Sequence, residues 1–177
     1  MSMNLPNKLT MFRVVLIPVF IVVLMSGLIA EPASRYIAVV IFCVASFTDY
    51  LDGHIARKYN LVTNFGKFMD PLADKLLVSA AMICMIELGM LPAWVVIIII
   101  SREFIITGFR LIAAEGGLVI AASWWGKIKT VTQMAMIILM LLGANKVIGT
   151  ILVVLATIFT VVSGVDYIVK NISVLKN

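Results

Sequence analysis

The sequence has little charge and few of the side chains that usually bind transition metals. Of its 177 residues, 13% are charged, one is histidine and two are cysteine. His54, Cys43 and Cys84 cannot supply the four nitrogen and sulfur ligands of a structural zinc site. The cysteines lie in different apolar runs, where a thiol behaves as a small hydrophobic residue. The low charge also excludes an ordinary soluble domain, in which about a quarter of the residues are charged.

Long apolar runs recur from end to end, with 63% hydrophobic residues and a mean hydropathy of +1.14. Most runs approach the ~20 residues that cross a hydrocarbon core of ~30 Å. Short loops make neighbouring spans antiparallel, and no linker or low-complexity tract divides residues 1–177. We expect one all-α integral membrane domain, a bundle of six transmembrane helices. The expected spans are 14–30, 33–56, 72–88, 92–112, 128–144 and 148–168.

The basic residues predict an orientation. With a cytoplasmic N-terminus, every lysine and arginine lies on or near the cytoplasmic side except Arg35 and Lys146, outside, and Arg102, within a span. By the positive-inside rule, we expect both termini to face the cytoplasm. We expect the protein to lie in the plasma membrane. Asn4 to Leu9 has too few apolar residues to span and is expected to form a short interfacial segment. The net charge of +5 suits anionic lipids or substrates, whereas the scattered basic residues give no sign of nucleic-acid binding.

Four aspartates interrupt this apolar sequence, in the strings D-Y-L-D-G-H-I-A-R from Asp49 and G-K-F-M-D-P-L-A-D from Gly66. An aspartate at the centre of a membrane helix costs roughly 2.5 to 3.5 kcal/mol. Two carboxylates ~4 Å apart repel by about 4 kcal/mol at an effective dielectric constant near 20. A divalent cation bound by these oxygens would remove the repulsion. The strings therefore predict a metal site, just inside the cytoplasmic boundary of the membrane.

Helical spacing places the first string on one stripe. At 100° per residue, Asp49, Asp52, Gly53, Ala56 and Arg57 share one side of the helix. The two small residues leave room for a ligand to approach the backbone. The arginine offers a planar fork that suits a phosphate.

The second string places Asp70 and Asp74 four residues apart, on one face of the next helix. Pro71 suits a first helical turn, so Asp70 could be a helix N-cap instead of a site residue. Capping does not explain Asp74, one turn further on. Gly66 is expected to bend the connection so that the two helices converge. Together the two strings predict a cradle for metal-bound phosphates.

The two strings match the signature D-x-x-D-G-x-x-A-R-x8-G-x-x-x-D-x-x-x-D at every specified position, so the chain resembles the CDP-alcohol phosphotransferase family over essentially its whole length. The resemblance implies attack of an alcohol on the lipid-bearing phosphorus of a CDP-linked lipid, with release of CMP. It also implies that the four aspartates bind Mg²⁺ or Mn²⁺, two ions in all, and that Asp74 is the base. Thr10 and Arg13 could touch the nucleotide, although Arg13 is equally explained as a topogenic charge. The expected CDP-binding residues are Thr10, Asp52, Gly53, Ala56, Arg57 and Gly66.

Two further stretches concern the acceptor. N-K-L-T-M-F-R-V-V-L-I-P near the start, and S-R-E-F-I-I-T-G-F-R followed by G-K-I-K-T-V-T-Q-M, resemble bacterial phosphatidylglycerophosphate synthases. This resemblance implies CDP-diacylglycerol as donor and sn-glycerol 3-phosphate as acceptor. Independently, Arg102 lies deep in an apolar helix, where facing lipid would be costly. It either pairs with a local acid or binds the acceptor phosphate. The expected acceptor-phosphate residues are Arg102, Arg110 and Lys129, with Lys75 or Lys127 as further candidates.

Other interpretations remain open at this stage. The same chemistry could use inositol phosphate as acceptor, or phosphatidylglycerol as in cardiolipin synthesis. A cation transporter would instead distribute its acids along a pathway, whereas here they cluster at one side and the motif does not recur in the second half. Asp166 is expected to be an interfacial charge. The resemblance also implies a homodimer.

Overall fold

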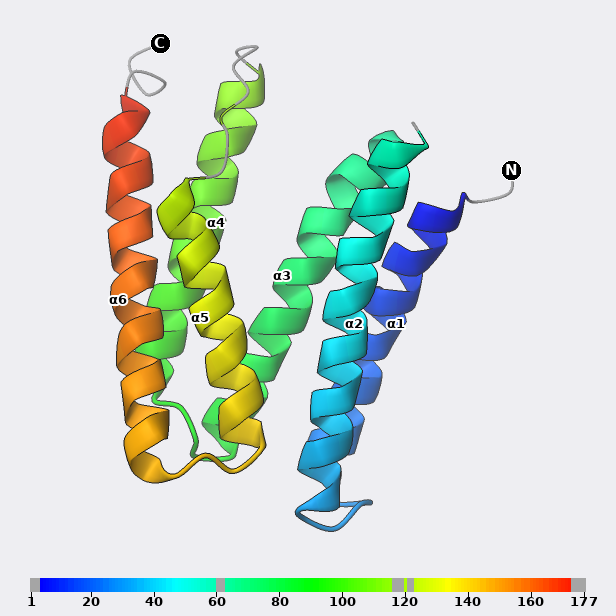
Figure 1. The fold of residues 1–177 in the computed structure, drawn as a ribbon, viewed down its shortest axis with the longest axis vertical. Coiled ribbons are helices and arrows are strands. Elements are labelled where there is room, and N and C mark those ends of the chain that lie inside the picture. Colours follow the sequence, from blue (N-terminus) through cyan, green and yellow to red (C-terminus); the bar gives the residue numbers. More distant parts are fainter. Residues whose placement is uncertain (1–3, 60–62, 116–119, 121–122, 173–177) are drawn as a thin grey trace. The chain divides into compact units, whose positions relative to one another are not determined.

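The computed structural model describes residues 4–59, 63–115, 120 and 123–172, and every regular element among them is a helix. Figure 1 shows these helices in chain order. The chain divides into two compact units, residues 1–87 with α1 to α3 and residues 88–177 with α4 to α6. The helices are α1 (Leu5–Met25), α2 (Ala33–Lys58), α3 (Asn64–Glu87), α4 (Ala93–Glu115), α5 (Trp124–Leu141) and α6 (Lys146–Lys170).

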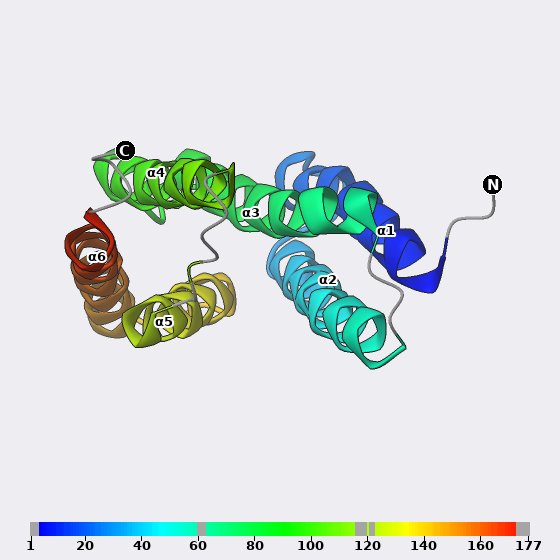
Figure 2. The same cartoon turned by 90° about the horizontal axis from the view of Figure 1, so that it is seen from above.

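In the first unit, α1 packs against both α2 and α3, which touch one another much less. Figures 1 and 2 show the three helices running in alternate directions. The beginning of α1, the end of α2 and the beginning of α3 therefore meet at one end of the unit. Phe20 of α1 and Phe42 of α2 are fully buried, with ring centroids 6.3 Å apart. Ala45, Leu77 and Ala81 are fully buried as well, and this core fixes how the three helix ends meet.

The first helix begins earlier than expected. The Asn4 side chain caps α1 by accepting a hydrogen bond from the Asn7 amide, and Pro6 lies in the first turn, where its fixed φ suits a helix. From there α1 continues without a break to Met25. The prediction of a separate segment at Asn4 to Leu9 and of a span over 14–30 was wrong. The polar residues Asn7, Thr10 and Arg13 are buried within the unit instead of ending the helix.

The third helix also begins earlier than expected. The Thr63 hydroxyl accepts a hydrogen bond of 3.0 Å from the Gly66 amide, three residues on, in the pattern of a helix N-cap. Asp70 and Pro71 consequently lie inside α3. The N-cap interpretation of Asp70, the expected bend at Gly66 and the expected start at residue 72 were therefore wrong. Asp70 instead presents its carboxylate from within the helix.

In the second unit, α6 packs against both α4 and α5. Ser123 and Asn145 cap α5 and α6 with their side chains. Phe109 of α4 meets Tyr167 of α6 edge to face, with centroids 5.9 Å apart. All three helices of this unit overlap the spans predicted at 92–112, 128–144 and 148–168, since hydropathy locates such helices well.

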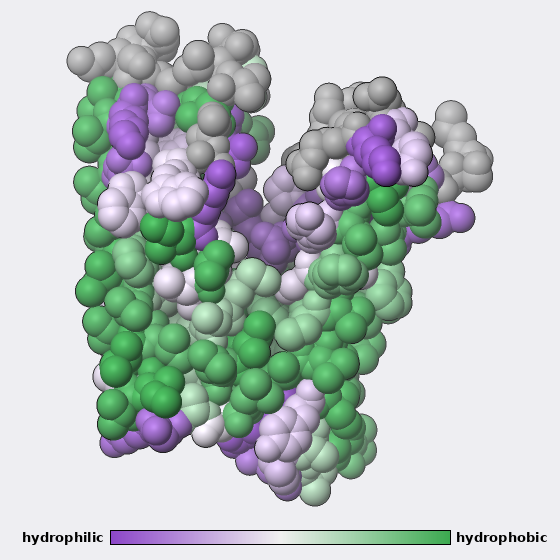
Figure 3. Space-filling model, in the orientation of Figure 1, coloured by the Kyte–Doolittle hydropathy of each residue, from purple (hydrophilic) through white to green (hydrophobic). Residues whose placement is uncertain are grey.

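Three of the described helical segments are long and apolar enough to cross a membrane, namely Leu5–Met25, Ala33–Ala56 and Lys146–Lys170. Figure 3 shows hydrophobic residues covering the middle of the helices, with hydrophilic residues gathered toward their ends. A belt of this kind is what a hydrocarbon core requires. The chain is thus a helical membrane protein, as predicted, while the count of six spans stays a prediction.

Candidate active site

All four aspartates of the signature line one cavity of about 390 Å³ at the end of the first unit where the three helices meet. Asp49 and Asp52 come from the last turns of α2, and Asp70 and Asp74 from α3. The predicted convergence of these side chains is therefore present in the structure. The remaining lining residues are Tyr50, Gly53, Gly66 and Pro71.

Arg13 of α1 contacts two aspartates of this cluster. Its side chain is 0% exposed, and it lies 2.7 Å from Asp49 through Nη1 and 2.7 Å from Asp52 through Nη2. Its Nε donates a hydrogen bond of 3.2 Å to the Ala45 carbonyl on α2. Asp52 is almost fully buried, whereas 40% of the Asp49 side chain is exposed. Nucleotide contact and topogenic charge were the two roles predicted for Arg13. The contact with the aspartates was not predicted, because 36 residues separate Arg13 from Asp49 in the sequence.

Two other polar residues of α1 face the same region. The Thr10 hydroxyl is fully buried and donates to Asp70 Oδ1 at 2.5 Å. One turn earlier, Asn7 Oδ1 accepts a hydrogen bond of 3.0 Å from the Thr63 hydroxyl. The same hydroxyl accepts a hydrogen bond from the Gly66 amide and so caps α3. The beginning of α1 is thus tied to both acid-bearing helices. Thr10, predicted to contact the nucleotide, lies at the site and holds a carboxylate there.

Two of the three small residues predicted to admit a ligand border the cavity. Gly53 and Gly66 line the cavity, and Ala56 is 9% exposed, one turn after Asp52. A Cβ added at Gly66 would lie 3.2 Å from Asn7 Oδ1 and 3.4 Å from Asp70 Oδ2. Gly66 is therefore needed for close packing at this point. The side chain of Arg57, the remaining residue of the predicted nucleotide set, lies outside the described residues.

The donor set fits a hard divalent cation, because the described residues that line the cavity offer four carboxylates and no sulfur or imidazole ligand. A complete coordination sphere is not formed: among the described residues, no three acidic, histidine or cysteine side chains form a group that could hold an ion as they stand. Arg13 engages Asp49 and Asp52, and Thr10 engages Asp70.

A second polar cluster lies within the other unit. Glu103 of α4 accepts hydrogen bonds from Lys129 of α5 and, at 3.3 Å, from Arg102 beside it. All three side chains are less than 20% exposed. Two of the predicted acceptor-phosphate residues therefore come together on a shared carboxylate, so the alternative interpretation of Arg102 as part of an internal ion pair is confirmed.

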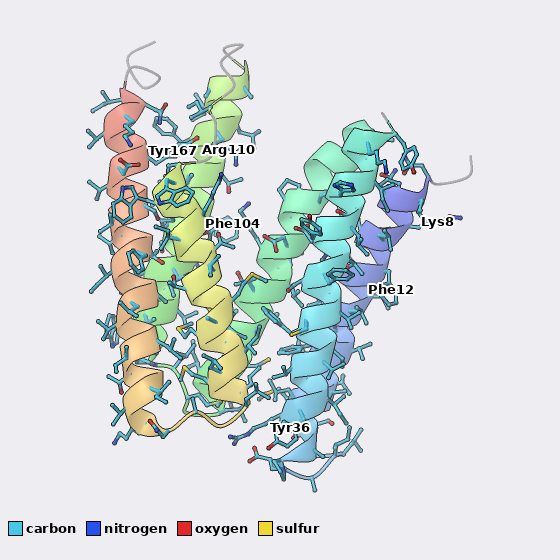
Figure 4. The ribbon with its side chains drawn as sticks, in the orientation of Figure 1. Lys8, Phe12, Tyr36, Phe104, Arg110 and Tyr167 are labelled. Carbon is cyan, nitrogen blue, oxygen red and sulfur yellow. The ribbon has the colours of Figure 1, made fainter. Side chains whose placement is uncertain are left out.

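The other two predicted acceptor residues lie elsewhere. Arg110 is exposed on α4, at the same end of the second unit as Tyr167, as Figure 4 shows. Lys75 belongs to the first unit, where its ammonium donates to the Pro71 carbonyl at 3.4 Å. Asp166 pairs with Lys170 at 2.7 Å.

Several known proteins are similar to this chain in sequence over almost its whole length. A protein of Bacillus subtilis named CDP-diacylglycerol–glycerol-3-phosphate 3-phosphatidyltransferase is 45% identical, over 98% of this chain and 97% of its own length. A Haemophilus influenzae protein of the same name is 40% identical, over 95% and 93%. A Mycobacterium tuberculosis protein named "Probable phosphatidylglycerophosphate synthase" is 42% identical, over 94% and 81%.

The family comparison covers most of the chain. Residues 3–162 match the model of a family described as CDP-alcohol phosphatidyltransferase. The matched range contains α1 to α5 and all four aspartates of the cavity. The chain therefore belongs to the CDP-alcohol phosphatidyltransferase family.

Proposed function

We propose that this protein transfers the phosphatidyl group of CDP-diacylglycerol to sn-glycerol 3-phosphate, giving phosphatidylglycerophosphate and CMP. The observation that carries the proposal is the single cavity lined by all four signature aspartates and by Gly53 and Gly66. The names of relatives that align over almost the whole chain favour this donor and acceptor. Together these observations favour a phosphatidylglycerophosphate synthase over other members of the family.

The first unit binds the donor in this proposal. Asp49, Asp52, Asp70 and Asp74 would hold Mg²⁺ or Mn²⁺, two ions in all, which when bound neutralise the pyrophosphate and the charge that develops on the leaving CMP oxygen. Asp52 and the small residues bind the nucleotide. A larger side chain at any of these small positions would occupy the space that CDP needs. The proposed nucleotide-binding residues are Thr10, Asp52, Gly53, Ala56, Arg57 and Gly66.

The transfer itself requires one base. The acceptor hydroxyl oxygen forms a bond to the phosphorus that carries diacylglycerol, and the bond from that phosphorus to the CMP oxygen breaks. The hydroxyl proton passes to the carboxylate of Asp74, and CMP leaves as an anion. Asp74 lies on α3 one turn beyond Asp70 and lines the same cavity, so it can serve both as ligand and as base. A positioned base of this kind contributes typically 10²- to 10⁴-fold to the rate.

Arg102, Arg110 and Lys129, all in the second unit, are the proposed cations of the acceptor-phosphate site. Lys75, next to Asp74 on α3, stays a further candidate predicted from the sequence. Glu103 holds Arg102 and Lys129 together, which keeps two cations of like charge close to one another before the phosphate binds. An anionic acceptor benefits from such a preassembled cluster, whereas serine would not need as many cations.

The membrane arrangement follows from the distribution of charge. We place all six helices across the plasma membrane, with the aspartate cavity and both termini on the cytoplasmic side, because most lysines and arginines lie on that side. CDP-diacylglycerol would reach the cavity from the bilayer and glycerol 3-phosphate from the cytoplasm. The proposed assembly is a homodimer.

Release of CMP by the purified protein tests the proposal. The protein is supplied with CDP-diacylglycerol and Mg²⁺, and separately with glycerol 3-phosphate, inositol 1-phosphate, serine or phosphatidylglycerol. We expect release with glycerol 3-phosphate alone. Release with another acceptor would retain the aspartate chemistry and refute the acceptor assignment. No release with any acceptor, together with divalent-cation flux in proteoliposomes, would favour the transporter.

A further inference from the structure

We infer that Arg13 is a positioning residue that holds Asp49 and Asp52 in the arrangement needed to bind a divalent cation. This inference rests on the proposed function of the aspartate cavity, but it concerns a residue outside the D-x-x-D strings and on a different helix. It assigns to α1 a specific part in the site, beyond anchoring the chain in the membrane.

The geometry of Arg13 is fixed from three directions. Its two terminal nitrogens contact Asp49 and Asp52 at 2.7 Å each, and Nε donates to the Ala45 carbonyl one turn before Asp49. The side chain is completely buried. A planar guanidinium bound on three sides has little freedom to rotate. The two carboxylates are therefore held at a set separation along α2.

The contacts leave coordination chemistry available. Arg13 contacts Oδ1 of Asp49 and Oδ2 of Asp52, which is one oxygen of each carboxylate. A carboxylate has two oxygens with lone pairs on each, so one held by an arginine can present the other to a cation. Both aspartates line the cavity. Partners that orient metal-binding side chains in this way typically change metal affinity or activity 10- to 100-fold when removed.

Two alternatives predict different results. If Arg13 merely packs the helices together, its removal lowers the melting temperature without changing the affinity of the remaining site. If Arg13 is only a competing cation, its removal makes divalent ions bind more tightly, because one positive charge has left the cluster. A positioning residue instead predicts weaker cation binding in folded protein.

Binding of Mn²⁺ to the purified full-length protein in detergent distinguishes these cases, with free Mn²⁺ measured by electron paramagnetic resonance. We expect Arg13→Met to weaken Mn²⁺ binding 10- to 100-fold. Arg13→Lys keeps the charge but not the fork, so it should recover only part of the affinity. Arg35→Met is the matched control: it removes another guanidinium from the same unit, one that pairs with exposed Glu31 at the opposite end of α2. The control should bind Mn²⁺ within twofold of the unmodified protein.

Circular dichroism establishes that each variant is helical before binding is measured. Unchanged or tighter Mn²⁺ binding by folded Arg13→Met would overturn the inference. Should Arg13→Met fail to fold, Arg13→Lys decides, and wild-type affinity in that variant would overturn the requirement for a fork. CMP release by the unmodified protein is measured in parallel. A protein that releases CMP but binds Mn²⁺ equally well with and without Arg13 would refute this inference and leave the proposed function standing.

Discussion

Replacement of Gly66 by alanine tests how closely the site is packed. Gly66 lies inside α3, and an added methyl group would lie 3.2 Å from Asn7 Oδ1, 3.2 Å from Thr63 Oγ1 and 3.4 Å from Asp70 Oδ2. These oxygens would have to move by a few tenths of an ångström. Two of them share a hydrogen bond, and Thr63 also accepts the Gly66 amide at 3.0 Å. The methyl group therefore presses on the network that ties α1 to α3.

Two opposing contributions determine the size of the effect. Alanine is favoured over glycine within a helix by roughly 0.5 to 1 kcal/mol. Weakening the two hydrogen bonds through Thr63 costs about 0.5 to 1.5 kcal/mol each. The net result is a destabilisation of about 1 kcal/mol, or a melting temperature about 2 to 4 °C lower for a chain of this size. Displacement of Asp70 and loss of the space for CDP should lower kcat/KM at least tenfold, equivalent to about 1.4 kcal/mol.

The matched control is Gly108→Ala on α4, where no described atom lies within 4 Å of the added methyl group. That variant gains the helical preference without a contact, so it should be slightly more stable and retain its activity within twofold. Thermal unfolding followed by circular dichroism, and CMP release at varied CDP-diacylglycerol concentrations, measure both quantities. Wild-type stability and kinetics in Gly66→Ala would refute the argument from packing.

Three further substitutions test the assigned roles. Asp74→Asn should reduce turnover at least 10²-fold with helical content unchanged, because an amide cannot accept the proton; full activity would refute Asp74 as the base. Glu103→Gln should lower the unfolding free energy by about 3 kcal/mol, since Arg102 and Lys129 lose their shared carboxylate. Addition of glycerol 3-phosphate should raise the melting temperature of this variant more than it raises that of the unmodified protein. Arg110→Ala should raise KM for glycerol 3-phosphate much more than for CDP-diacylglycerol, and equal effects would argue against an acceptor site.

The helices could be predicted from hydropathy, but their beginnings could not always be. The second span was expected from residue 33, and α2 begins there. The third was expected from residue 72 because proline suits a first turn, yet α3 begins at Asn64 and carries Pro71 inside it. An internal proline removes one backbone hydrogen bond, and neighbouring groups in a membrane protein can compensate for it. The sequence alone does not reveal that Thr63 provides the cap.

The spacing of residues within each helix was enough to predict the aspartate cluster, but not its contacts with α1. The intervals between Asp49, Asp52, Asp70 and Asp74 are set by helical geometry, and the four side chains line one cavity. The contacts of Arg13 depend on the packing of α1 against α2, which no local pattern encodes. The sequence alone therefore does not reveal that Arg13 lies beside Asp49 and Asp52.

The most direct test of the central claim is to determine which phosphorus is attacked. CDP-diacylglycerol labelled at the lipid-bearing phosphate and glycerol 3-phosphate labelled with a second phosphorus isotope are supplied together with Mg²⁺, and the products are separated. The account predicts a lipid that contains both labels and CMP that contains neither. Phosphatidate carrying only the donor label, with the acceptor label joined to the nucleotide, would place the attack on the other phosphorus and contradict the account.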